Sequence, residues 1–127
     1  MGTRVYFENF SSVDSIAGAY AGDGISKQDI VKVLDDAKIW VAWYGYGDYC
    51  GNSFVLYEVN GTLYEVNGSH CSCYGLEGQW KPEKTSWKVL HHILENGTKF
   101  ADGSYAGGIY AENALRSLVK RKMNAKD

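Results

Sequence analysis

The sequence predicts an α+β fold, in which an antiparallel β-meander of three or four strands packs against three or four α-helices. A β-branched and aromatic run at residues 38–44 is followed by two strand-like segments on either side of Asn60-Gly61, a dipeptide that favours a tight hairpin turn. Segments whose apolar residues recur every three or four positions stand before and after these strands. Strands and helices that are segregated along the chain in this way are typical of the α+β class.

Composition indicates a single globular domain that spans residues 1–127. Hydrophobic residues make up 45% of the chain and charged residues 22%, which is ordinary for a folded protein with one core. The formal net charge of −2 argues against broad nucleic-acid binding through a basic surface. We find no apolar run near the roughly 20 residues of a membrane span and no secretory signal, so we expect a cytoplasmic protein without membrane contact.

The N-terminal third predicts one strand and two helices. Residues 3–8 alternate in polarity, as a short strand does, and Ser11 or Ser12 can cap a helix that ends at Gly22. A second helix starts at Ser26, because Asp29 follows it at capping-box spacing. The apolar stripe of that helix consists of Ile30, Val33, Leu34 and Ala37.

The middle of the chain predicts the sheet. Residues 38–44 are too continuously apolar for a strand with one wet face, and we expect a central strand there, followed by a connection at 45–52. The segments 53–59 and 62–67 should form a hairpin that flanks this strand. A two-residue loop would place Tyr57 opposite Tyr64 and Val55 opposite Val66, whereas a three-residue loop would shift the register by one, and both alternatives stay open.

Two further helices are expected near the C-terminus, packed together on one face of the sheet. The first should run from about residue 84 to residue 95 and the second from about residue 109 to residue 123. Their inward-facing residues are expected to be Trp87, Leu90, His91 and Leu94 in the first helix, and Ala111, Leu115, Leu118 and Val119 in the second.

Residues 68–80 concentrate the reactive side chains of the chain in one glycine-rich loop. Cys71 and Cys73 form a Cys-x-Cys pair beside His70, and if a metal is bound, these three residues and Cys50 are its expected ligands. Structural zinc sites typically show two such close pairs, whereas this chain has one. We therefore expect reduced thiols, no metal and no cofactor.

The same cysteines raise the alternative of a nucleophile. Cys71 or Cys73 could be activated by His70 or His91, with Glu77 orienting the base. Local signatures of cysteine proteases are missing, and such residue types meet by chance in many chains of this size. We expect a protein that is not an enzyme.

Aromatic residues favour a binding surface. The chain has ten tyrosines and four tryptophans, which are the residue types that protein interfaces and base-stacking sites prefer. Those close to the cysteine-rich loop are the expected exposed binding residues, together with one histidine: Tyr46, Tyr49, His70, Tyr74 and Trp80.

The segment 64–80, with the sequence YEVNGSHCSCYGLEGQW, resembles a group of small uncharacterised proteins of bacteriophages and prophages. With the flanking motifs FVLYE at 54–58 and KPE at 81–83, the resemblance covers about a third of the chain and leaves the first forty-odd residues outside. It implies a phage origin and expression in the bacterial cytoplasm. It carries over no catalytic residues.

Small phage proteins often counter host defence, and this analogy completes the expectation. The chain should be a stoichiometric binding protein that inhibits a bacterial defence effector, as anti-CRISPR proteins do. Two alternatives remain: a sponge that sequesters a cyclic nucleotide signal, and a zinc-supported or cysteine-dependent enzymatic module. The identity of the target and a homo-oligomeric state are open at this point.

Overall fold

The computed structural model describes residues 5–8, 10–22, 24–47, 50–70, 75–95 and 108–124. Of residues 8, 46–47, 50–51, 70 and 108–112 it describes the backbone alone.

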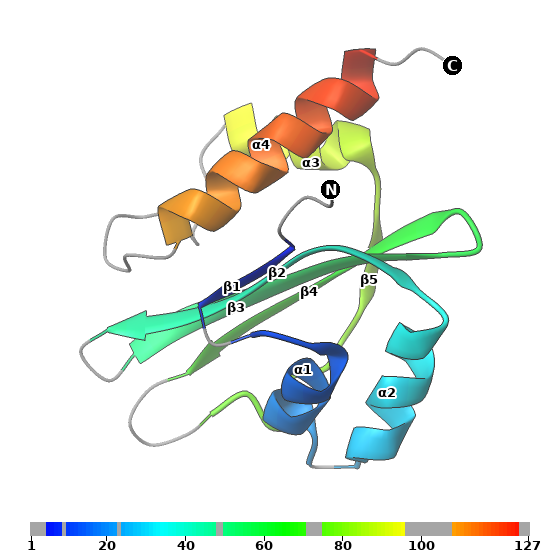
Figure 1. Ribbon diagram of the computed structural model, residues 1–127, viewed down its shortest axis with the longest axis vertical. Coiled ribbons are helices and arrows are strands. Elements are labelled where there is room, and N and C mark those ends of the chain that lie inside the picture. Colours follow the sequence, from blue (N-terminus) through cyan, green and yellow to red (C-terminus); the bar gives the residue numbers. More distant parts are fainter. Residues whose placement is uncertain are drawn as a thin grey trace.

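A five-stranded sheet lies between two pairs of helices (Figure 1). One face carries α1 (Val13–Tyr20) and α2 (Lys27–Asp35), and the other carries α3 (Trp87–Glu95) and α4 (Gly108–Asn124). The α+β class is confirmed, and so is the expectation that the two C-terminal helices share a face. Helices on both faces bury the sheet on both sides, which explains why the strand is apolar from residue 39 to residue 44.

The strands stand in the order of the sequence. They are β1 (Tyr6–Glu8), β2 (Lys38–Gly47), β3 (Cys50–Val59), β4 (Thr62–His70) and β5 (Glu83–Thr85). The expected purely antiparallel meander is wrong, because β1 pairs with β2 in parallel. The α1–α2 segment carries the chain back along the sheet before β2 begins, and such a crossover connects parallel neighbours.

The hairpin of β3 and β4 forms with the two-residue loop. Asn60 and Gly61 have φ of 52° and 81°, the left-handed values that the favoured hairpin turn needs. Tyr57 therefore pairs with Tyr64, and Val55 pairs with Val66. The expected placement of this hairpin around the strand at 38–44 is wrong, since β3 lies between β2 and β4 and is the central strand of the sheet.

β2 extends beyond the predicted strand. The expected connection at 45–52 is instead the end of β2 and the start of β3, which pair from Gly45 and Asn52 outward. A larger residue at position 45 would be crowded, because its Cβ would lie 3.0 Å from the indole of Trp43. A bulge between Ile39 and Val41 adds one residue to β2, so that Trp40 packs on the same core as Val41.

Two hydrophobic cores fill the spaces above and below the sheet. The core on the α3–α4 side includes Val41, Trp43, Phe54, Leu56, Leu90, Leu94, Leu115, Leu118 and Val119. The core on the α1–α2 side includes Phe10, Ile16, Tyr20, Ile30, Leu34, Val55, Tyr57, Val66, Leu76 and Trp80. The stripe predicted for α2 is correct for Ile30 and Leu34, whereas Val33 is 39% exposed and Ala37 follows the end of the helix.

The predicted start of α3 is wrong by three residues. Glu83–Thr85 pairs with β4 as the edge strand β5, and the helix begins at Trp87. Ser86 separates the two elements, since its hydroxyl oxygen accepts a hydrogen bond from the backbone N–H of Val89 at 3.1 Å. The predicted inward positions of α3 and α4 are confirmed by burial for Leu90, Leu94, Leu115, Leu118 and Val119. The prediction is wrong for His91, which is exposed, and the side chain of Ala111 lies outside the described residues.

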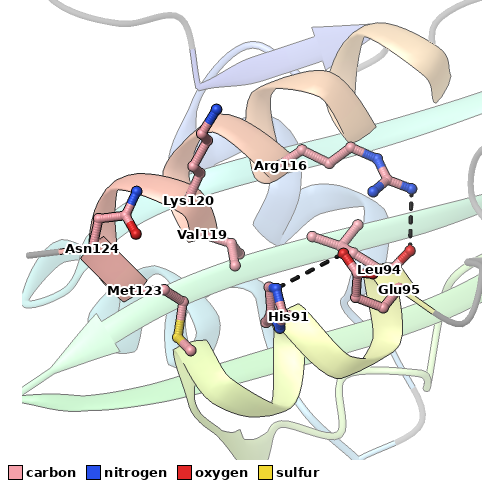
Figure 2. Close-up of a pocket in the computed structure, with 8 residues that line it drawn as sticks. All are labelled: His91, Leu94, Glu95, Arg116, Val119, Lys120, Met123 and Asn124. Atoms are coloured by element: carbon pink, nitrogen blue, oxygen red, sulfur yellow. Dashed lines mark hydrogen bonds and ion pairs between the residues drawn. The ribbon is translucent and has the colours of Figure 1, made fainter.

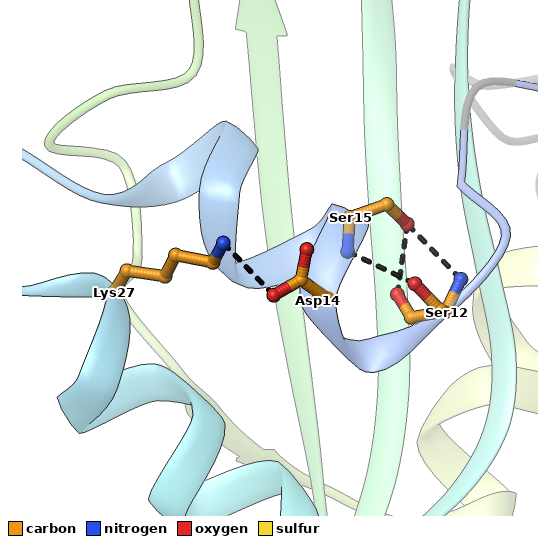
Figure 3. A network of polar contacts seen from close by, with 4 residues as sticks. All are labelled: Ser12, Asp14, Ser15 and Lys27. Atoms are coloured by element: carbon orange, nitrogen blue, oxygen red, sulfur yellow. Dashed lines mark hydrogen bonds and ion pairs between the residues drawn. The ribbon is translucent and has the colours of Figure 1, made fainter.

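The two N-terminal helices start at the predicted caps. The hydroxyl of Ser12 accepts from the backbone N–H of Ser15, and the Ser15 hydroxyl accepts in return from the backbone N–H of Ser12 (Figure 3). Ser26 and Asp29 form the equivalent capping box at the start of α2. An ion pair of 2.8 Å between Asp14 and Lys27 connects the two helices.

A cluster of aromatic and cationic residues holds the C-terminal part of α4 against the sheet. Trp40 and Trp87 lie edge to face with 5.3 Å between ring centroids. Lys122 of α4 places its Nζ atom 4.6 Å from the Trp40 centroid, and Lys38 lies 4.0 Å from the same ring. The Trp40 Nε1–H donates to Glu58 at 2.9 Å. The cluster joins α3, α4, β2 and β3.

Buried tyrosines make the free energy of unfolding depend on pH above 10. Burial, with a smaller effect of the neighbouring Tyr64, raises the pKa of Tyr57 to about 12, whereas an unfolded tyrosine ionises near pH 10. Between these values the unfolded chain releases a proton that the folded chain keeps, so stability falls as pH rises. Urea denaturation between pH 9 and pH 12 should show this loss. In Tyr57→Phe the free energy of unfolding should fall less steeply with pH. An identical slope for both proteins would contradict it.

Candidate functional site

The register of the sheet brings three predicted residues to one end. Tyr46 of β2 pairs with Gly51 of β3, and Gly51 pairs with His70 of β4. Cys50 precedes Gly51 and pairs with Gly47. Tyr46, Cys50 and His70 come from three strands, yet their backbones lie in adjacent rows of the sheet, at the end opposite the Asn60-Gly61 turn. We call these two rows the sheet end.

Four other predicted residues, Tyr49, Cys71, Cys73 and Tyr74, lie outside the described residues. Tyr49 belongs to the two-residue link between β2 and β3, and the other three follow His70 directly in the chain. Of the predicted ligand set, the structure thus describes the backbones of Cys50 and His70, and all four side chains lie outside the described part. In that part, no group of three or more His, Cys, Asp or Glu side chains is arranged to hold a metal ion.

The expectation that Trp80 is an exposed binding residue is wrong. Its side chain is 8% exposed and belongs to the core on the α1–α2 side. The ring stacks on Tyr57 with 5.9 Å between centroids and an angle of 9°, and it meets Tyr20 edge-on at 5.3 Å. An aromatic residue at this place stabilises the fold, and it also fixes the end of the cysteine-rich segment to the sheet.

The segment after the cysteines is fastened to β4 by Gln79. The side-chain oxygen of Gln79 accepts from the backbone N–H of Ser69 at 2.9 Å, and the side-chain nitrogen donates to the Ser69 carbonyl at 2.7 Å. The amide thus satisfies Ser69 as a neighbouring strand would. The same nitrogen donates to the carbonyl of Gly75 at 2.8 Å. We call this arrangement the Gln79 clamp, and it holds the chain on both sides of residues 71–74.

Further contacts fix the segment from the other side. Leu76 is 1% exposed in the core, and the backbone N–H of Gly78 donates to the carbonyl of Tyr20 at 3.2 Å. Glu77 accepts from the backbone N–H of Gly75 at 3.3 Å. Residues 75–80 therefore lie between the end of α1 and the edge of β4.

The space under the clamp requires glycine in β4. A Cβ at Gly68 would lie 2.7 Å from the Ser53 hydroxyl oxygen and 3.2 Å from the side-chain oxygen of Gln79. Ser53 is 3% exposed and forms a buried hydrogen bond of 2.5 Å with the Tyr20 hydroxyl. Gly68 thus allows β4, the clamp and this buried pair to approach one another closely.

Of the residues proposed for a nucleophilic enzyme, the structure describes the side chains of His91 and Glu77, and it keeps these two apart. His91 lies on α3, whereas Glu77 lies on the α1–α2 side of the sheet, next to Gly22. Glu77 therefore cannot orient His91. The carboxylate near His91 is that of Glu95, at 3.8 Å on the same helix.

A groove of about 300 Å³ lies between α3 and α4 (Figure 2). We call it the α3–α4 groove. Its walls come from His91, Leu94 and Glu95 of α3 and from five residues of α4. Arg116 closes one end, because its guanidinium donates to the carbonyl of Leu94 at 3.2 Å. Met123, which is 41% exposed, lies near His91.

Comparison with known proteins brings no match, since no protein family, curated protein or solved structure is significantly similar to this chain. The resemblance of residues 64–80 to small phage proteins therefore stays a prediction. None of the helices among the described residues combines the length and the apolarity that crossing a membrane requires.

Removal of the clamp should loosen the sheet edge locally. Gln79→Leu keeps the size of the side chain but removes its three hydrogen bonds. We expect a loss of about 1–2 kcal/mol in the free energy of unfolding and faster amide exchange at Ser69. Gln28→Leu, at an exposed position of α2, is the matched control and should leave Ser69 unchanged. Equal exchange of Ser69 in the wild type and in Gln79→Leu would contradict the role of the clamp.

Glycine substitutions should have opposite effects at two positions. Gly68→Ala should lower the free energy of unfolding by about 1–3 kcal/mol, because the new methyl group meets Ser53 and Gln79. Gly18→Ala is the control, since position 18 lies exposed within α1 with no atom within 4 Å of a new Cβ. It should stabilise the protein by about 0.5–1 kcal/mol. Chemical denaturation of both variants provides the measurement. An unchanged free energy of unfolding in Gly68→Ala would contradict the close approach at position 68.

Proposed function

We propose that this chain is a stoichiometric binding protein that inhibits a bacterial host-defence protein, as anti-CRISPR proteins do. The observation that carries the proposal is the Gln79 clamp, which fixes the chain on both sides of residues 71–74 beside the sheet end. Flanking residues that are already fixed lose little conformational freedom when a partner docks on them, and this lowers the cost of binding.

The proposed contact residues are Tyr46, Tyr49, His70 and Tyr74. Backbone pairing supports the grouping of Tyr46 with His70. Tyr49 and Tyr74 join this group through their nearness in the chain to the same strand ends. Tyrosine offers a large apolar contact area with a polar end, which is why it is frequent at the energetic centre of interfaces. The resemblance to phage proteins points to host defence as the setting.

The test is a titration of a purified CRISPR effector with the protein. Inhibition should saturate at a fixed molar ratio. Tyr49→Ala and Tyr74→Ala should each weaken the affinity by on the order of 2 kcal/mol, or about 30-fold, if they are energetic centres of the interface. Val89→Ala, at a 46% exposed position of α3, is the control and should inhibit like the wild type.

Other outcomes would replace this proposal. Intact cyclic nucleotide released from the heated protein would favour the sponge. Destruction of the target by a sub-stoichiometric amount of protein, lost in Cys71→Ala, would establish an enzyme. Normal inhibition by both tyrosine variants would move the interface away from the sheet end.

A further inference from the structure

The exposed surface of α4 is basic and borders the α3–α4 groove. Four cations lie between Arg116 and Lys122, and this stretch contains no acidic residue. Arg116 is bonded to the carbonyl of Leu94, and Lys122 lies over the rings of Trp40 and Trp87. The other two cations, at positions 120 and 121, extend from exposed positions of the helix.

The groove fits a protein segment better than a nucleic acid. Binding to a nucleic-acid backbone strengthens with the number of phosphates that cations neutralise, and two exposed cations neutralise few. The bottom of the groove is apolar, since Leu94 and Val119 are 4% and 1% exposed. Met123 adds a flexible apolar side chain at the rim. An apolar side chain that is flanked by carboxylates would complement the apolar bottom of the groove and the cations Lys120 and Arg121 at its border.

Such a segment is found on α2 of the same chain. Val33 is 39% exposed and offers an apolar side chain on the outer side of the helix. Asp29 and Asp36 lie four residues before and three residues after it, so the three share one exposed side of the helix. With 100° of rotation per residue, Asp29 and Asp36 lie between Val33 and Lys32 around the helix axis. Lys32 is therefore not next to Val33 on this side of the helix.

The end of α2 is electrostatically unfavourable in an isolated chain. Asp35 is the last residue of the helix and Asp36 is its C-cap, so two carboxylates stand at the negative end of the helix dipole. Both side chains are exposed. Cations from another molecule would relieve this repulsion, and α4 offers Lys120 and Arg121.

We propose that α2 of one chain docks in the α3–α4 groove of a second copy, with Val33 over the apolar bottom and Asp36 next to Lys120. The two surfaces lie on opposite faces of the sheet (Figure 1), so the contact is head-to-tail and can repeat from copy to copy. α2 has nine residues and is about 13 Å long, which is short for a stable interface. Association is therefore weak and depends on protein concentration.

Charge reversal tests this contact in the isolated protein. Sedimentation velocity between about 10 µM and 1 mM at low salt should show a sedimentation coefficient of the wild type that rises with concentration. Lys120→Glu and Asp36→Lys should each abolish the rise, because each places like charges in contact. The double variant with both substitutions should regain it. Circular dichroism checks that every variant is folded.

Three results would overturn the proposal. The first is a wild type that stays monomeric up to about 1 mM at low salt. The second is undiminished association of Lys120→Glu, which would place the contact elsewhere. The third is a folded double variant that does not associate. Since no host protein takes part, these results are independent of the titration that tests inhibition.

Discussion

The whole structure depends on the burial of β3 on both faces while it is paired on both edges. Phe54 and Leu56 enter the core on the α3–α4 side, and Val55 and Tyr57 enter the core on the α1–α2 side. A slip of one residue against β2 or β4 would exchange the two sets and spoil both cores at once. The buried hydroxyl of Ser53 fits the same register, because it meets Tyr20 of α1. Alternation of side chains along β3 thus contributes to the cores under both helix pairs.

Features of the fold that arise within a few residues could be predicted from the sequence. The Asn60-Gly61 turn and the capping box at Ser26 depend on local backbone preferences, and both are present. β5 and the parallel pairing of β1 could not be predicted in this way. Glu83–Thr85 has no apolar alternation, and it becomes a strand because the edge of β4 lies beside it. Such pairing is decided by tertiary structure and leaves little trace in a short window of sequence.

The site was predictable in part. Extending the Tyr57–Tyr64 register by six residues along both strands places Gly51 opposite His70, so this pairing was within reach of the sequence. Gln79 was missed, because a glutamine in a glycine-rich loop has no pattern that announces a contact with a strand. Trp80 was assigned to the surface because the aromatic composition of a segment does not distinguish rings that bind partners from rings that fill a core.

The separation of the two cores by the sheet affects how such a chain can change during evolution. Residues up to the start of β2 supply α1 and α2, which form most of the cover on one face of the sheet, and Leu76 and Trp80 complete it. A lineage could exchange this cover for another as long as the new one fits the sheet residues beneath it, such as Ala42, Val55 and Val66. The opposite helix pair would need no compensating substitutions as long as β1 keeps Phe7, which is buried in the core on the α3–α4 side. Homologous chains could therefore keep one face and diversify the other.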